Sequence, residues 1–406
     1  MSSRTSASSG LKNLALHGGT PVRERLLPYG RHDIDDDDVA AVVAVLRSDW
    51  LTGGPAVGEF ERAVARVAGA DEAVAVNSGT AGLHAAMFAL GVGPGDEVIV
   101  PPMTFAASSN AVIYQGGTPV FADVDPDTLL LDPSRVEAAV TPRTKAIMAV
   151  DYAGQLCDYD ALRGVAASRD LPIVADSCHA IGAEDRGRRI GALADLAVFS
   201  FHPVKHLTTG EGGAVATAQP ELAARMRAFR NHGITVDHHQ RSAQGSWKYE
   251  IVDLGFNYRL SDIQCALGAA ELAKLPARLA RRQAIAAEYT RAFASVPEVR
   301  TLAVRPDASH AYHLFVVRVD VARLTCDRAM LFAALRGEGI GVNVHYIPVY
   351  WHPLYRRRFG MREGLCPVAE AAYEQILTLP MFPSMTAADV GDVVEAVTKV
   401  VEAFRR

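Results

Sequence analysis

Residues 196–213 read LAVFSFHPVKHLTTGEGG. The segment opens with an almost wholly apolar run, the pattern of a strand that is covered on both faces. A turn that carries Lys205 follows, and the glycines then lead into another apolar run, GAVAT, at 213–217. Ligands of open parallel sheets bind beyond the carboxyl ends of the strands. The turn after this strand is therefore a candidate functional site.

The same succession of apolar run, turn and amphipathic segment recurs between about residues 70 and 217. Such alternation favours an α/β fold with a mostly parallel sheet flanked by helices. Upstream, the acids of DIDDDDVAAVVAVLRS at 33–48 suit the first turn of an amphipathic helix. We expect seven strands, at 72–76, 97–100, 119–122, 146–150, 172–175, 196–200 and 213–217.

The chain beyond the sheet has a different pattern. Two long helical stretches are expected first, and proline breaks the second near Pro276. From about residue 311, apolar strand patterns alternate with helical ones, which favours a smaller α+β domain. The expected helices are 220–230, 261–295, 327–337, 367–376 and 386–405, and the expected strands are AYHLFVVRVD at 311–320 and GVNVHYIPV at 341–349.

These patterns divide the chain into three parts. The leader Met1 to Gly10 is rich in serine and lacks the apolar stretch of a signal peptide, so we expect a disordered tail. The expected parts are the tail with an N-terminal arm at 1–27, a large domain at 28–275 and a small C-terminal domain at 276–406.

Composition excludes several classes of partner. The 406 residues include 41 Lys and Arg against 46 Asp and Glu, so no sequence-wide basic field exists for nucleic acid or an anionic membrane. No run approaches the roughly 18 consecutive apolar residues of a membrane helix. The five cysteines form no C-x-x-C pair and no zinc-ligand spacing, so we expect a reduced, cytoplasmic setting and no metal.

Distinctive residues follow several of the expected strands. Asn77 to Gly82 form a small-residue turn before an apolar helix, whose free N–H groups could hold a phosphate. A plain capped turn is an equally good interpretation of this segment. Phe105 and Asp176 follow two other strands, and a core aromatic and a helix cap are the alternatives for them.

Lysine is scarce, with six in the chain, and Lys205 alone lies just past a buried-type strand and before a glycine-rich segment. An amine among apolar and small residues loses its proton more readily, as covalent chemistry with carbonyl groups requires. An exposed loop lysine is the common alternative. Together, the phosphate turn, the aromatic, the carboxylate and the lysine match the needs of pyridoxal 5′-phosphate.

Six blocks carry a family resemblance: NSGTAGLHAA, GDEVIVPPMTF, ADSCHAIGA, FSFHPVKHLTTGEGG, RNHGI and LGFNYRLSDIQCALG. In order and spacing they resemble the DegT/StrS-type nucleotide-sugar aminotransferases, a branch of the fold-type-I PLP enzymes. The resemblance runs from about residue 28 to the C-terminus. It implies that Lys205 is the Schiff-base lysine and that Asp176 is the partner of the pyridine nitrogen.

The resemblance also assigns the remaining cofactor contacts. Phe105 is similar to the ring that stacks on the cofactor, and His179 to a ring-side contact that is glutamine in many relatives. Asn257 is similar to the asparagine that reaches the phosphate of the neighbouring subunit, which implies a homodimer with shared active sites. The residues implied for the phosphate of the same subunit are Ser200, Gly79 and Thr80.

Three segments indicate the substrate: 29–61, 246–260 and GVNVHYIPVYWHPLYRRRFG at 341–360. They look most like the enzymes that make UDP-4-amino-4,6-dideoxy-N-acetyl-β-L-altrosamine for pseudaminic acid, with L-glutamate as amino donor. The candidate substrate contacts are His345, Tyr346, Tyr258, Arg259 and His232, and Arg259 together with the arginines at 356–358 could receive the diphosphate. The alternatives are a strand at 341–349 that contributes packing alone and a solvated arginine run.

Two other functions stay open at this point. The same chemistry could act on a perosamine-type sugar or on a keto-cyclitol in antibiotic or polysaccharide assembly. A non-catalytic PLP-binding regulatory protein is the alternative of another class, although such a protein would not need Lys205. The related 3-dehydratases are disfavoured because they replace this lysine with histidine.

Overall fold

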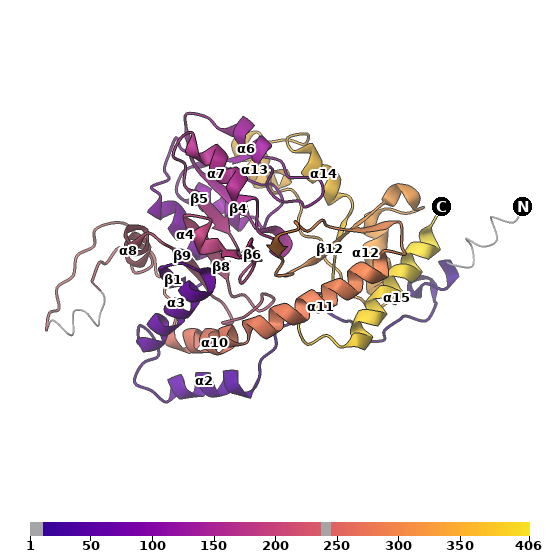
Figure 1. The fold of residues 1–406 in the computed structure, drawn as a ribbon, viewed down its shortest axis with the longest axis horizontal. Helices are drawn as coiled ribbons and strands as arrows, with labels where there is room; N and C mark the ends of the chain where they lie inside the picture. Colours follow the sequence, from indigo (N-terminus) through magenta and orange to yellow (C-terminus); the bar gives the residue numbers. More distant parts are fainter. Residues whose placement is uncertain (1–10, 237–244) are drawn as a thin grey trace, which may run out of the picture.

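The computed structural model describes residues 11–236 and 245–406, and the predicted disordered tail at 1–10 lies outside them (Figure 1). The predicted mixed α/β fold is confirmed. Its main sheet has seven strands in the order β1-β9-β8-β5-β4-β2-β3. β9 is antiparallel to both of its neighbours and the other pairs are parallel. The strands are β1 Glu72–Val76, β2 Glu97–Val100, β3 Thr118–Phe121, β4 Thr144–Val150, β5 Ile173–Asp176, β8 Leu196–Ser200 and β9 Gly213–Thr217.

These seven strands confirm the predicted ones to within two residues. The inner strands are buried along nearly their whole length, as continuous apolar runs require. Helix α4 packs against β1, β8 and β9 and lies beside α5 and α8, while α3 packs on β1 and β9. The helices of this part are α2 Asp36–Leu46, α3 Pro55–Ala68, α4 Gly79–Ala89, α5 Ala107–Tyr114, α6 Pro133–Ala139, α7 Tyr159–Ala167, α8 Pro220–Phe229 and α10 Asp262–Ala273.

The C-terminal part contains a three-stranded antiparallel sheet in the order β10-β12-β13. Helix α11 leads into it from the main sheet and lies beside α15 (Figure 1). The strands of this sheet are β10 Val299–Thr301, β12 Phe315–Val319 and β13 Ile376–Leu379. A third sheet is formed by three two-residue strands, β6 Glu184–Asp185, β7 Arg188–Arg189 and β11 Ala308–Ser309. The helices are α11 Leu275–Phe293, α12 Arg328–Gly337, α13 Pro353–Phe359, α14 Pro367–Tyr373 and α15 Ala387–Phe404.

One predicted strand is wrong. Residues 341–349 form no strand and make a single bridge to the small sheet, between Asn343 and Thr378. Pro348 interrupts the segment and has no N–H to give to a strand ladder. The strand that pairs with β12 is β13, which begins at the residue where the sequence predicted the end of a helix.

The predicted break within the helical stretch 261–295, near Pro276, is confirmed. Helix α10 ends at Ala273 and α11 begins at Leu275, with Pro276 in its first turn. Proline is tolerated there because the first N–H groups of a helix have no intrahelical acceptor. Ser261 caps α10 with a capping box. Its side chain accepts the Gln264 N–H, and the Gln264 side chain accepts the Ser261 N–H.

The described residues form two hydrophobic cores, and α11 runs from one to the other. The first surrounds the main sheet and includes Leu275, and the second fills the C-terminal part and includes Tyr289. The arm contributes Leu14 and Leu27 to the second core. The segment 349–376 packs with the first core. The domain boundary at residue 275 stays a prediction, and it falls where the chain passes from one core to the other.

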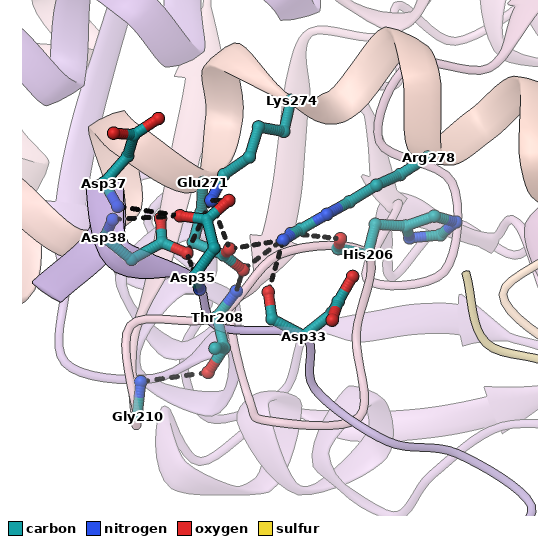
Figure 2. A network of polar contacts seen from close by, with 10 residues as sticks. All are labelled: Asp33, Asp35, Asp37, Asp38, His206, Thr208, Gly210, Glu271, Lys274 and Arg278. Carbon is teal, nitrogen blue, oxygen red and sulfur yellow. Dashed lines mark hydrogen bonds and ion pairs between the residues drawn. The ribbon is translucent and has the colours of Figure 1, made fainter. Parts of the chain in front are cut away.

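Ion pairs join the N-terminal segment to the α10–α11 junction (Figure 2). Lys274 contacts Asp35 at 2.8 Å and also Asp38, which is fully buried. Arg278 contacts Glu271 at 2.6 Å, and Glu271 accepts a hydrogen bond from the Thr208 N–H at 3.1 Å. The chain passes between the two cores at both segments, so this network links the cores. Within the described residues, no helix is long and apolar enough to cross a membrane.

We expect Glu271→Ala to lower the free energy of unfolding by about 3 kcal/mol, because it strands the buried Arg278 guanidinium without its carboxylate. Urea denaturation followed by circular dichroism measures the loss. The matched control is Glu363→Ala, whose exposed carboxylate pairs with Arg356, and it should cost less than about 1 kcal/mol. Equal losses in the two variants would contradict a structural role for the network.

Candidate active site

The predicted site residues meet at one edge of the main sheet. Asp176 ends β5, Ser200 ends the adjacent β8, and Gly79 opens α4 just after β1. β1 and β8 both pair antiparallel with β9, so they run in the same direction and end at the same edge. The expected position of these three residues at the ends of the strands is therefore observed, and their roles stay predictions.

The start of α4 forms a cradle built for an anion. The Ser78 hydroxyl accepts the Ala81 N–H at 3.0 Å and caps the helix. A Cβ atom at Gly79 would lie 2.9 Å from the Ser200 Cβ and 3.1 Å from the Cys178 sulfur, so a side chain there would fill the space. The N–H groups of the first turn and the positive end of the helix dipole suit a phosphate at this place.

Asp176 is the buried carboxylate of the site, with 7% of its surface exposed. It accepts the Ser108 hydroxyl at 2.7 Å and the Cys178 N–H at 3.3 Å. Ser108 in turn lies 2.6 Å from the Thr104 hydroxyl. These contacts fix the orientation of the carboxylate, and an oriented carboxylate is the group that a protonated pyridine nitrogen needs.

Lys205 is half-buried in the turn after β8, and its Nζ lies 3.4 Å from the Nε2 of His313. Burial lowers the pKa of the Lys205 amine, while the nearby Cys178 and Asp176 oppose that change. An amine with a lowered pKa is more often neutral, and the neutral form is the nucleophile and the base.

His179, Tyr346 and Phe105 line the same place. The Tyr346 hydroxyl lies 3.1 Å from the Nε2 of His179, and the ring-side contact of His179 with the cofactor stays a prediction. The Phe105 ring is 64% exposed and its centroid lies 6.4 Å from that of Tyr346. An exposed ring at this edge is available to stack on a planar ligand.

The other predicted substrate residues divide into two groups. His345 is buried, and its Nδ1 lies 2.8 Å from the Thr378 hydroxyl of the small sheet. Asn257, Tyr258, Arg259 and His232 gather instead beside the end of β1. Their contacts are Asn257 O with Asn77 Nδ2 at 3.3 Å, Tyr258 OH with His84 Nδ1 at 3.1 Å and Arg259 Nη1 with Asn231 Oδ1 at 2.7 Å, and His232 is exposed with a positive φ of 60°.

Sequence reasoning missed two residues of the site, Ser108 and His313. Ser108 is one small residue in a helix of small residues, and His313 begins an apolar strand pattern. The signal that could have found them is a polar side chain in an otherwise buried segment, which needs a partner. That signal does not say which partner it has.

The residues present fit pyridoxal phosphate. The cradle at Gly79 suits its phosphate, the oriented Asp176 suits its ring nitrogen and the buried amine of Lys205 suits its aldehyde. The Nδ1 of His179 is buried without a hydrogen-bond partner among the described residues, as expected of a group that serves a bound ligand.

Comparisons with known proteins give the same result. Residues 32–398 match the model of the DegT/DnrJ/EryC1/StrS aminotransferase family. The spore coat polysaccharide biosynthesis protein SpsC of Bacillus subtilis is 43% identical, covering 94% of this chain and 98% of its own.

Two solved structures are similar along nearly the whole chain. The PLP-form of the putative sugar aminotransferase Spr1654 of Streptococcus pneumoniae is 33% identical with a TM-score of 0.86, covering 93% of this chain and 100% of its own. Helicobacter pylori PseC, an aminotransferase involved in the biosynthesis of pseudoaminic acid, is 31% identical with a TM-score of 0.87, covering 94% and 100%. This chain belongs to the DegT/DnrJ/EryC1/StrS aminotransferase family and is a sugar aminotransferase that uses pyridoxal phosphate.

Proposed function

We propose that the enzyme moves an amino group from L-glutamate to C4 of a nucleotide-linked 4-keto-6-deoxyhexose. The acceptor that we propose is UDP-2-acetamido-2,6-dideoxy-β-L-arabino-hex-4-ulose, on the route to pseudaminic acid. The observation that carries the chemistry is the Lys205 amine, whose pKa burial lowers, at the sheet edge where Asp176 and the Gly79 cradle also lie.

The residues divide the work of the reaction. When bound, pyridoxal phosphate supplies an aldehyde that exchanges amino groups and a ring that accepts electrons. Asp176, oriented by Ser108, holds the proton of the ring nitrogen in place. Lys205 is the base that takes the proton from the donor carbon and returns it as an acid within the same half-reaction.

Tyr346 supports the substrate assignment. The segment 341–360 looks most like the altrosamine-forming enzymes, and it brings the Tyr346 hydroxyl into contact with the Nε2 of His179. PseC, whose name refers to pseudoaminic acid biosynthesis, is similar over 94% of this chain. Arg259 is exposed beside Asn231, so its guanidinium is accessible to a diphosphate.

A second acceptor is favoured by a different observation. SpsC is 43% identical and is named for spore coat polysaccharide biosynthesis. The alternative is therefore the same transfer to another keto-sugar, such as a perosamine-type hexose, or to a keto-cyclitol. The intact lysine and carboxylate support catalysis over a purely regulatory role.

We further propose a homodimer with shared active sites. The segment 247–256 exposes a row of large apolar side chains, with Trp247 82% and Leu254 77% exposed. An apolar run of this size on a surface is typical of an interface. Asn257 follows this segment directly, and it is similar to the asparagine that in the resembled family reaches the phosphate of the neighbouring subunit.

Lys205→Ala should abolish the visible absorbance that the protein acquires with pyridoxal phosphate, because no other residue supplies the amine at this edge in our proposal. Addition of L-glutamate should change the spectrum of the wild type and leave that of the variant unchanged. Lys12→Ala, at an exposed position, is the matched control and should behave as the wild type. Retention of absorbance and turnover in Lys205→Ala would refute the assignment.

Mixing two inactive variants should restore activity if Asn257 acts across the dimer. Subunits with Lys205→Ala and subunits with Asn257→Asp, refolded together, form one intact site in each mixed dimer. We expect about a quarter of wild-type activity from random pairing. Light scattering checks the dimer. Restored activity is impossible if both residues serve the same subunit, so an inactive mixture of folded dimers contradicts this proposal.

Acceptor choice can be measured with UDP-, GDP- and dTDP-linked 4-keto-6-deoxyhexoses, each incubated with L-glutamate. We expect the UDP-linked 2-acetamido sugar to give the highest kcat/KM, detected as the amino sugar by mass spectrometry, with the C4 configuration determined by NMR. Preference for a GDP- or dTDP-linked sugar would replace the pseudaminic acid assignment with the second candidate, and the aminotransferase chemistry would stand.

A further inference from the structure

Three buried histidines surround the Lys205 amine. The ring of His313 lies 4.5 Å from that of His179 and 5.6 Å from that of His206, measured between centroids. The Nε2 atoms of the two outer rings already have partners, the Tyr346 hydroxyl for His179 and the Ala311 oxygen for His206. The Nε2 of His313 faces the Nζ of Lys205 at 3.4 Å. His313 is therefore the histidine whose free edge is directed at the lysine.

The backbone around His313 is held at an unusually close crossing. The Ala311 N–H donates to the Gly154 oxygen at 2.8 Å. A Cβ atom at Gly154 would lie 2.7 Å from the Tyr312 nitrogen and 3.0 Å from the His313 nitrogen, so only glycine allows these two backbone segments to pack together. Ala153 and Tyr312 both have positive φ angles, of 59° and 47°. Strained backbone of this kind persists where surrounding structure holds it, and it clusters at functional sites.

Arg282 fixes the same crossing from behind. It is 1% exposed, and its Nη1 donates to the main-chain oxygens of Tyr312 at 3.0 Å, His313 at 3.3 Å and Met381 at 3.0 Å. Its Nε has no hydrogen-bond partner among the described residues. A buried cation held by carbonyl groups is costly, and burial together with Arg278 lowers the pKa of Arg282 to about 9. Such a residue is expected where it has a positional task.

The same surroundings keep His313 neutral. Burial lowers the pKa of His313 well below its ordinary value, and the charges of Lys205 and Arg282 act in the same direction. A neutral imidazole can accept a hydrogen bond at Nε2 when its proton is on Nδ1. The other titratable groups near Lys205 are the Asp176 carboxylate and the Cys178 thiol, both of which raise the pKa of the lysine, and burial keeps the thiol protonated by raising its own pKa.

We propose that His313 is a positioning residue for Lys205. The Nε2 of His313 accepts a hydrogen bond from the Nζ of Lys205 and holds the amine where it transfers the proton. Arg282 and Gly154 hold His313 in this place. The proposal rests on the proposed role of Lys205 as base and acid. His313 itself gains and loses no proton, because the proton that Lys205 takes up is returned in the same half-reaction.

The first test uses the cofactor-free protein and needs no turnover. The chain has six lysines, so [ε-13C]lysine NMR gives few signals, and Lys205→Arg assigns the one of interest. His313→Phe removes a neutral acceptor that favours the ammonium, so the titration midpoint of Lys205 should fall by about one pH unit. His313→Gln, which restores an acceptor, should bring the midpoint back toward the wild type. His17→Phe, at an exposed position, is the matched control and should change nothing.

The second test separates positioning from folding in the cofactor-loaded enzyme. His313→Phe should slow the glutamate half-reaction by ten- to a hundredfold, roughly the cost of a misplaced group, with little change in the KM for glutamate. The isotope effect with 2-deuterated glutamate should rise, because proton transfer becomes the slow step. His313→Asn, which is too short to reach Lys205, repeats both measurements if His313→Phe does not fold.

An unchanged Lys205 midpoint and an unchanged isotope effect in a folded His313 variant would overturn the proposal. Failure of the proposed function has a different signature. An active Lys205→Ala enzyme would show that Lys205 is not the base, and the effect of His313 on the titration of Lys205 would be unaffected by that result. A rise in the KM for glutamate alone, with an unaltered titration midpoint of Lys205, would assign His313 to donor binding and would also overturn its proposed positioning role.

Discussion

The structure depends on keeping the amine of Lys205 inside the protein. Water would stabilise its ammonium form, and burial removes that stabilisation and lowers its pKa. In its proposed role Asp176 must stay close to the ring nitrogen, yet its charge favours the ammonium form of the lysine. The two requirements conflict, and they are compatible only if both side chains are fixed. The contacts of Ser108 with Asp176 and of His313 with Lys205 are the means of fixing them.

The loop that carries Lys205 is anchored by the ion pairs between the two cores. Glu271 accepts the Thr208 N–H, and Arg278 holds Glu271 and contacts the His206 oxygen (Figure 2). At its other end the loop runs into Gly213, where a Cβ atom would lie 2.6 Å from the Ser78 oxygen at the start of α4. The loop therefore touches the phosphate cradle and the junction of the cores at once. Movement of one core against the other would be transmitted to the lysine.

Much of this arrangement could be predicted from the sequence, because its elements are local. Apolar runs such as 196–200 are too short for helices and are bounded by turn residues, and parallel strands bring their ends to one edge. The contact of His313 with Lys205 joins residues 108 positions apart and depends on tertiary packing that no local pattern carries. The strand predicted at 341–349 was wrong for a related reason. Its apolar pattern resembles a strand, but Pro348 and the contacts of Tyr346 hold the segment in irregular backbone.

The irregular backbone at Tyr346 brings a proposed substrate contact, Tyr346, against a proposed cofactor contact, His179. Burial raises the pKa of Tyr346 and lowers that of His179, so both groups are neutral in this contact. When the neutral Tyr346 hydroxyl donates to the Nε2 of His179, the proton of the imidazole is on Nδ1, which has no partner among the described residues. His179 then presents a donor to a bound group, and Tyr346 decides that it does. If Tyr346 contacts the sugar and His179 the cofactor, as we propose, a change at Tyr346 alters the hydrogen bonding of His179, and this one hydroxyl links sugar recognition to the cofactor site.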